Sequence, residues 1–238
     1  MADLVDQLWS AHGVEAAPFD VFAGDVYVDS FPAALRRPGS PAGPARLELR
    51  PDPFQEPSAT APPWVGPRSR RLVYLTLGTV VASDAVLRPV VEGLAGLDAD
   101  VLVALGSATG DELGPRPPHV HVVPFVDQAA VLRVADLAVH HGGSGTLLGA
   151  LVTGTPQLLL PTGADQVWNA ALAAESGLAA VLEPDDVDPD TIARLGAAEL
   201  GSLRPAAGLA RDELARRPSP ADVVADLTAR VERTAAAA

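Results

Sequence analysis

From residue 71 onward, short apolar runs alternate with stretches in which apolar residues recur every three or four positions. Short apolar runs bounded by turn residues are typical of buried strands, and the second spacing is typical of helices that pack on a sheet. We expect strands at residues 72–77, 101–105, 120–123, 137–139, 157–160 and 178–182. Because strand and helix patterns alternate, the chain is predicted to form an α/β fold with a doubly wound, Rossmann-like parallel sheet.

The helical stretches carry recognisable start and stop residues. Asp188-Pro189 and Ser219-Pro220 each place a cap residue before a proline at the first helical position. The predicted helices span residues 84–97, 128–134, 147–152 and 165–177, followed by one helix from 188 and one from 219 to about 233, with a frayed tail at 235–238.

Residues 1–70 lack this regular alternation. Leu4, Leu8 and Trp9 can line one face of a short helix that ends at His12-Gly13, and residues 25–29 and 45–50 alternate like strands. Between and after these strands the chain is dense in proline, which is typical of an extended connector. These prolines are Pro38, Pro41, Pro44, Pro51, Pro53, Pro57, Pro62, Pro63 and Pro67.

The stretch HHGGSGT, residues 140–146, follows a predicted strand and opens an amphipathic helix. The first turn of a helix has unpaired N–H donors and a partial positive charge, and glycines let the backbone approach an anion closely. With a histidine as an added donor, the stretch predicts a diphosphate site. Alternatively, its glycines only pack the strand against the helix. It is neither a G-x-G-x-x-G fingerprint nor a P-loop, since the chain contains no lysine.

A second polar turn, with Asp165 and Gln166, follows the next apolar run. In an open parallel sheet both turns emerge at the carboxyl ends of strands, where ligands bind. A carboxylate and an amide can hold neighbouring hydroxyls, so a diphosphate site beside this pair suits a sugar nucleotide. The alternative is that Asp165 only caps the helix that Gly177 ends.

Composition narrows the classes of partner. The chain has 238 residues, 48% of them apolar, and a formal net charge of −13, which argues against nucleic acid and anionic membrane surfaces. It has no cysteine, its five histidines form no metal-ligand pattern, and no apolar run reaches the length of a membrane span. The first residues lack a signal-peptide pattern, so we expect a cytoplasmic location.

Six stretches occur in order along the chain: LVYLTLGT (72–79), VPFVDQAAVL (123–132), HHGGSGT (140–146), GTPQ (154–157), Asp165-Gln166 and RPSPA (217–221). With them, residues from about 72 to 231 resemble the C-terminal, donor-binding half of GT-B-fold, family 1 glycosyltransferases, above all the actinobacterial type that glycosylates macrolides, anthracyclines and other polyketides. The resemblance divides the chain into residues 1–70, a remnant of an N-terminal domain with a proline-rich linker, and residues 71–238, a nucleotide-sugar donor-binding domain.

The resemblance also implies roles for single residues. Gly78 and Thr79 would face the donor phosphates and the acceptor. Phe125 and Val126 would hold the nucleotide base, and Gln128 would contact the ribose or base. His141 matches the phosphate-contacting histidine, whereas His140 has either a contacting or a supporting role. The residues implied at the phosphates are His141, Gly142, Gly143, Ser144, Gly145 and Thr146, and those at the sugar hydroxyls are Asp165 and Gln166.

In function, the resemblance implies transfer of a hexose or deoxyhexose, with inversion, from a dTDP- or UDP-linked donor to a hydroxyl of a polyketide-like acceptor. It implies no cofactor and no metal, because the helix start and His141 would stabilise the leaving diphosphate. The general base would lie in an N-terminal acceptor domain that is nearly absent here, so the catalytic residues stay unknown. That domain, or a second copy of the chain, would be the protein partner. The alternatives are a non-catalytic nucleotide-sugar-binding or interaction module and, third, a nucleotide-sugar epimerase.

Overall fold

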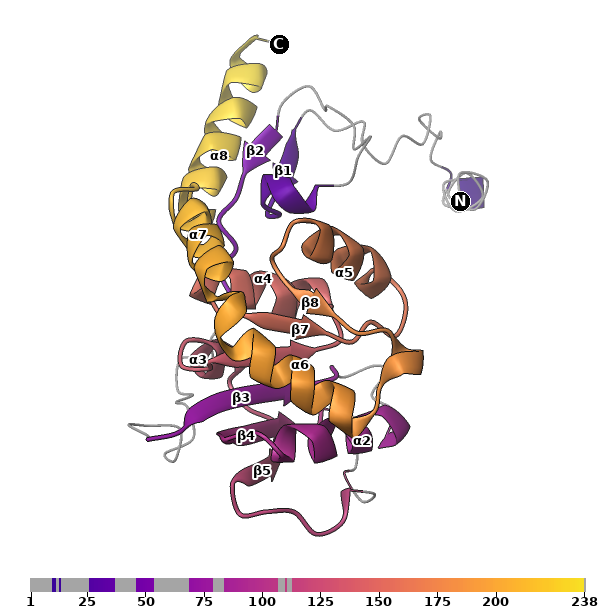
Figure 1. Ribbon diagram of the computed structural model, residues 1–238. Helices are drawn as coiled ribbons and strands as arrows, with labels where there is room; N and C mark the ends of the chain where they lie inside the picture. The colour runs from indigo at the N-terminus through magenta and orange to yellow at the C-terminus, as the bar shows by residue number, and fades with distance from the viewer. Residues whose placement is uncertain are drawn as a thin grey trace.

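The computed structural model describes residues 10–11, 13, 26–36, 46–53, 69–78, 84–106, 110 and 113–237. Most of them form one parallel sheet covered by helices on both faces (Figure 1). The elements, in chain order, are β1 (Tyr27–Asp29), η1 (Ala33–Leu35), β2 (Arg46–Glu48), β3 (Arg71–Thr76), α2 (Asp84–Ala95), β4 (Ala99–Ala104), β5 (Val120–Val123), α3 (Gln128–Leu132), β6 (Leu137–His140), α4 (Ser144–Thr153), β7 (Gln157–Leu159), α5 (Gln166–Glu175), β8 (Ala180–Val181), η4 (Pro184–Asp186), α6 (Pro189–Ser202), α7 (Arg204–Ala215) and α8 (Pro220–Ala237).

The main sheet has six strands in the order β5-β4-β3-β6-β7-β8, and every neighbouring pair is parallel. The chain enters at β3, winds outward to β5, and then returns to β6 and winds outward the other way. The strand order therefore reverses between β3 and β6, where Thr76 is paired with His140. Loops diverge at such a switch point and leave a crevice at the carboxyl ends of the strands. This arrangement confirms the predicted doubly wound α/β fold.

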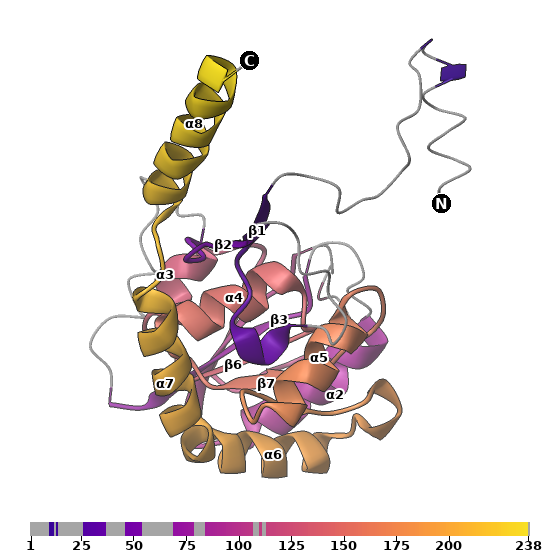
Figure 2. The same cartoon turned by 90° about the horizontal axis from the view of Figure 1, so that it is seen from above.

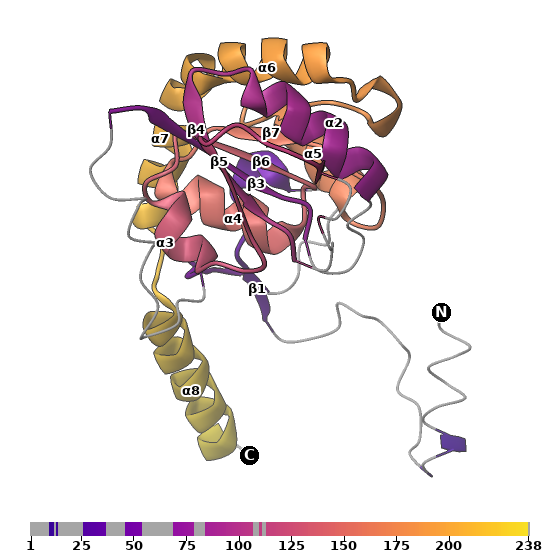
Figure 3. The same ribbon diagram turned by 90° about the horizontal axis from the view of Figure 1, so that it is seen from below.

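Both faces of the sheet are apolar, as a parallel sheet covered on both sides requires. In β3, Val73 and Leu75 point into a core shared with α2 and α6, whereas Leu72 and Tyr74 point into a core shared with α3 and α4. Figures 2 and 3 show the same layers, with α2 and α6 on one side of the sheet and α3 and α4 on the other. No helix among the described residues combines the length and the apolar character needed to cross a membrane.

Every strand predicted after residue 71 is present, and the helix ends differ in places. The helix expected to reach Leu97 ends at Ala95, before a glycine. Asp188 caps α6 by accepting hydrogen bonds from the N–H groups of Asp190 and Thr191, as predicted. The prediction of a frayed tail at 235–238 is wrong, because α8 continues to Ala237. Alanine is the strongest helix former, which accounts for the longer helix.

Helix α7 was not predicted. Its buried residues Ala207, Ala210 and Leu214 recur at helical spacing, but alanine contributes little to a hydrophobic pattern. Pro205 stands in its first turn, which is where proline is tolerated, and so separates α7 from α6.

The predicted strands of the first 70 residues are confirmed, although the described parts are shorter. They are β1 and β2, which pair with each other in parallel as a separate two-stranded sheet. After β1 the chain returns to the main domain: Leu35 is buried in the core beside α4, α5 and α7, and Ser176 donates a hydrogen bond to the carbonyl of Ala34 at 2.8 Å. The predicted early helix at Leu4 to Trp9, His12 and most of the proline-rich stretch lie outside the described residues.

Candidate functional site

The turn between β6 and α4 lies at the carboxyl edge of the sheet, and its two histidines point in different directions. His140 is fully buried; its Nε2 lies 2.9 Å from Oε1 of Gln157, and its Nδ1 accepts a hydrogen bond of 3.1 Å from the N–H of Gly142. Burial lowers the pKa of His140 to about 3, so the side chain is neutral. His140 therefore has the supporting role: it fixes the orientation of the turn from its buried side.

His141 lies between two glycines instead. A Cβ on Gly78 would come within 2.8 Å of the His141 ring, and a Cβ on Gly143 would lie 2.5 Å from Nε2. The backbone at Gly78 has φ of +85°, a conformation that side chains rarely adopt. The Nδ1 atom of His141 is buried and has no hydrogen-bond partner among the described residues, which leaves Nε2 as the nitrogen that can reach a ligand. Burial lowers the pKa of His141, and the negative charge of Asp165 counteracts part of this effect.

Helix α4 begins directly after Gly143, so its first N–H groups face the same space as the His141 ring. Gly143 is the N-cap residue and makes no side-chain cap. A Cβ added to Gly145 would meet nothing within 4 Å. The helix start therefore combines N–H donors, of which that of Ser144 also interacts with the Asp165 carboxylate, with a positive dipole end and room for a ligand.

Asp165 joins the second predicted turn to the first. Its carboxylate accepts hydrogen bonds from the hydroxyl of Ser144 at 2.7 Å and from the amide of Asn169 at 3.2 Å. The same amide donates to the carbonyl of Gly142 at 2.9 Å. The hydrogen bond from Ser144 lowers the pKa of Asp165, so the group is ionised at neutral pH. Asp165 occupies the N-cap position of α5 but its side chain makes no cap there, so the interpretation of Asp165 as only a helix cap is wrong.

Gln166 follows in the first turn of α5. Its Oε1 accepts hydrogen bonds from both the backbone N–H and the hydroxyl of Thr162, at 2.9 and 3.0 Å. The oxygen is thereby used within the loop, and the amide nitrogen is the group suited to a ligand. The orientation of this side chain is fixed before any ligand binds.

The loop between β5 and α3 forms the opposite side of the site. Phe125 is 78% exposed, whereas Val126 is buried. Asp127 caps α3 through Oδ1, and its buried Oδ2 has no hydrogen-bond partner among the described residues. Gln128 Oε1 lies 3.5 Å from the hydroxyl of Tyr74 and 3.3 Å from that of Thr146, so this side chain links the loop to α4.

A cavity of about 1360 Å³ opens over these loops. The predicted site residues that line it are Gly78, Phe125, Val126, Gln128, His141, Gly143, Ser144, Gly145, Thr146, Asp165 and Gln166. Gly142 lies behind the lining, and Thr79 lies outside the described residues. The described lining contains no arginine, and its donors to an anion include backbone N–H groups, the His141 ring and the hydroxyls of Ser144 and Thr146. The structure thus brings the predicted residues together, and their binding roles stay predictions.

Several lining residues were not predicted as site residues, among them Tyr74 and members of the stretch 49–53. Tyr74 comes from the middle of a strand and is buried. The apolar pattern around it predicted a strand but did not indicate a ligand site. Residues 49–53 come from the proline-rich stretch, which nothing in the local pattern connects to a ligand site.

Comparison with known proteins identifies the family of the chain. Residues 88–230 match the family described as "Erythromycin biosynthesis protein CIII-like, C-terminal domain". The chain belongs to this family. Elloramycin glycosyltransferase ElmGT of Streptomyces olivaceus is 41% identical over 68% of the chain and 41% of its own length. L-demethylnoviosyl transferase of Streptomyces niveus is 33% identical over 96% of the chain and 60% of its own length.

Among solved structures, the glycosyltransferase VinC in complex with DTDP has a TM-score of 0.81 and 30% identity, and the match covers 98% of this chain and 58% of that one. The chain spans about half the length of the curated relatives it matches. The GT-B-type donor-domain fold of the family is therefore present in this chain.

Proposed function

We propose that this chain is the donor-binding half of a glycosyltransferase, which transfers a hexose or deoxyhexose from a nucleoside diphosphate to a hydroxyl of a small-molecule natural product. The observation that supports this most directly is the position of His141, held between Gly78 and Gly143 beside the start of α4. Asp165, tied to Ser144, borders the same space. Diphosphate and sugar groups thereby have adjacent, oriented partners in one cavity.

In the proposed reaction, the acceptor oxygen attacks the anomeric carbon and forms the new glycosidic bond with inversion. The bond between that carbon and the diphosphate oxygen breaks, and its electron pair leaves with the diphosphate. The N–H groups at the start of α4 and the His141 ring stabilise this growing charge, an electrostatic contribution of several kcal/mol in a water-poor site. The hydrogen-bonded carboxylate of Asp165, with its lowered pKa, is a weak base and instead orients sugar hydroxyls.

The proton of the acceptor hydroxyl must go to a general base. We assign this base to an acceptor-binding half, for which the longer relatives have enough additional residues. The donor is proposed to be dTDP- or UDP-linked, without metal or other cofactor. The dTDP-bound relative supports the first of these nucleotides. An N-terminal acceptor domain or a second copy of this chain is the proposed protein partner.

Calorimetric titration of dTDP and UDP tests the donor site. We expect micromolar binding to the wild type and at least a tenfold loss, about 1.4 kcal/mol, in His141→Ala. His119→Ala is the matched control, since this histidine contacts the carbonyl of Ala95 at the opposite edge of the sheet. Absence of nucleotide binding, or equal binding by His141→Ala, would contradict the proposal.

A transfer assay separates the enzyme from a non-catalytic binding module. With a labelled sugar nucleotide and a polyketide acceptor, we expect no product from this chain alone and product once an acceptor domain of a relative is supplied. Binding without product under both conditions favours the module. Product from the chain alone would refute the assignment of the general base to the acceptor half.

A further inference from the structure

Residues 49–53, here called the strap, run from the end of β2 to the junction of α3 and α4. The strap follows β2 and so comes from the first 70 residues, far in sequence from the predicted site. Its members Leu49, Pro51, Asp52 and Pro53 all line the cavity. A segment that resembles a linker in composition is thus part of the candidate donor site.

Main-chain hydrogen bonds and proline packing hold the strap in place. The N–H of Leu49 donates to the carbonyl of Asp29, and the N–H of Arg50 donates to the carbonyl of Pro218, both at 2.8 Å. Pro51 is buried. At the far end, Pro53 lies over α4, where a Cβ on Gly149 would be 3.8 Å from the Pro53 ring and 3.1 Å from Leu132 of α3. The strap therefore ends at the junction of α3 and α4.

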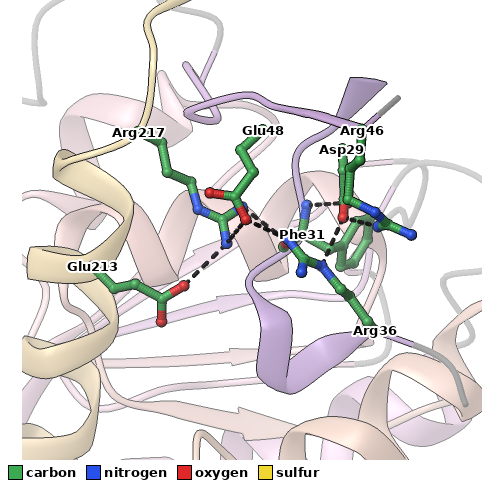
Figure 4. Close-up of polar contacts among 7 residues, drawn as sticks. All are labelled: Asp29, Phe31, Arg36, Arg46, Glu48, Glu213 and Arg217. Atoms are coloured by element: carbon green, nitrogen blue, oxygen red, sulfur yellow. Dashed lines mark hydrogen bonds and ion pairs between the residues drawn. The ribbon is translucent and has the colours of Figure 1, made fainter. Parts of the chain in front are cut away.

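A cluster of charged side chains, here called the clasp, fixes the start of the strap (Figure 4). Asp29, only 3% exposed, accepts hydrogen bonds from the guanidinium groups of Arg36 and Arg46. Arg217, at the end of α7, donates to the carbonyl of Phe31 at 2.9 Å, and it pairs with Glu213 at 3.0 Å and Glu48 at 3.7 Å. The clasp comprises Asp29, Phe31, Arg36, Arg46, Glu48, Glu213 and Arg217.

Asp52 is the polar side chain that the strap brings to the cavity. Prolines on both sides restrict the backbone there, because the ring of Pro53 also limits the conformation of the preceding residue. Asp52 is exposed, lines the cavity, and has no hydrogen-bond or ion-pair partner within the described part of the chain. An ionised carboxylate only accepts hydrogen bonds, so it suits a ligand hydroxyl or amine and repels phosphate.

The position of the strap along α4 indicates which part of a sugar nucleotide would lie beside it. Gly149, which lies next to Pro53, stands five residues after Ser144, which is about 7.5 Å along the helix from the predicted phosphate end. The strap lies on the α3 side of α4, toward Gln128, whereas Asp165 belongs to the α5 side. Between the diphosphate and a base near Phe125, the group that carries hydroxyls is the pentose.

We propose that Asp52 accepts a hydrogen bond from the 3′-hydroxyl of the pentose, so that the strap forms the wall of the nucleoside subsite. The inference rests on the proposed function and deepens it, since it adds a binding residue from outside the donor-binding domain. The clasp residues Asp29 and Arg217 then act as positioning residues for Asp52.

The test compares dTDP with its 3′-deoxy analogue, 3′-deoxythymidine diphosphate, by calorimetry. We expect Asp52→Ala to weaken dTDP binding about tenfold and to leave binding of the analogue unchanged. The wild type should bind the analogue as weakly as Asp52→Ala binds dTDP, because removal of the hydroxyl and of the carboxylate breaks the same contact. Asp98→Ala, which removes an equal charge from a fully exposed carboxylate at the opposite edge of the sheet, should change neither constant.

Equal losses for the two ligands in Asp52→Ala, or no loss for dTDP, would overturn the inference. A thermal unfolding curve verifies that the variant is folded, which the exposure of Asp52 leads us to expect. If the wild type binds no dTDP, the proposed function fails together with the inference. If binding depends on His141 and not on Asp52, only the inference is wrong.

Discussion

The turn between β6 and α4 and the strap, which the clasp holds at its start, border the same cavity, but they are built in different ways. The turn consists of consecutive residues, 140–146, in which His141 packs against Gly143 and His140 accepts a hydrogen bond from Gly142; Gln157, Asp165 and Asn169 add contacts from the neighbouring strand and helix. The clasp joins residues as far apart as Phe31 and Arg217, which are 186 positions apart in the sequence. Contacts inside a local motif therefore specify part of the geometry of the turn, whereas the opposite wall depends wholly on contacts between distant segments.

The two regions are also stabilised by different forces. The turn relies on backbone conformation, close packing and a neutral buried histidine. The clasp relies on a network of ion pairs around the almost wholly buried Asp29 and Arg217, in which the loss of Asp29 removes the acceptor that two arginines share. Substitutions in the clasp should therefore lower stability most, and substitutions in the turn should lower ligand affinity most.

Removal of the Asp29 carboxylate should have the largest effect. Asp29→Ala leaves Arg36 and Arg46 without their common acceptor, which we expect to cost about 3 kcal/mol of the free energy of unfolding, measured in urea. The control Asp98→Ala removes an exposed ion pair with Arg70 and should cost less than about 1 kcal/mol. Similar losses in the two variants would show that the clasp is no stronger than a surface ion pair.

Gly143→Ala should weaken nucleotide binding with little change in stability. The backbone at Gly143, with φ of −61° and ψ of 141°, suits alanine, so the only conflict is the new Cβ at 2.5 Å from His141 Nε2. Displacement of the ring should cost about tenfold to hundredfold in dTDP affinity, roughly 1.4–2.7 kcal/mol. Gly201→Ala, in open space on α6, is the control in the same calorimetric titration and should bind as the wild type does.

His140 should make stability depend on pH. Its folded pKa of about 3 lies below the unfolded value of 6.5, so below pH 6.5 the unfolded chain binds a proton that the folded chain does not. Stability should consequently fall as the pH drops from 6.5 toward 3, by about 1.4 kcal/mol per unit from this group. Urea unfolding at pH 5 and pH 7 should show a smaller difference in His140→Asn, where an amide oxygen can still accept from Gly142. An unchanged difference would argue against a buried neutral His140.

The smallest effect concerns the pKa of His141, which NMR titration of its ring can follow. Burial should keep this pKa below 6.5, and Asp165→Asn should lower it further because the opposing negative charge is lost. A bound diphosphate favours the imidazolium, so dTDP should bind more tightly as the pH falls toward the His141 pKa. A pKa that rises in Asp165→Asn would show that the two side chains do not interact as the geometry indicates.

Much of the candidate site could be read from the sequence because its parts are contiguous. Each strand ends close to the end of its apolar run. The two turns meet because they follow β6 and β7, neighbouring parallel strands whose carboxyl ends lie at the same edge of the sheet. The role of Asp165 was left open, since N-cap position and ligand contact have the same sequence signature. Helix α7 was not predicted because a face of alanine carries little hydrophobic signal.

By itself, the sequence determined the alternating elements, the order of the motifs and the pair of histidines at the turn. Each of these depends on a short-range period or on steric rules that act between neighbours in the chain. Only the tertiary structure decided that His140 supports the turn from the core while His141 borders the cavity. It likewise decided that Asp52 borders the cavity, because ion pairs and packing between distant segments place the strap there.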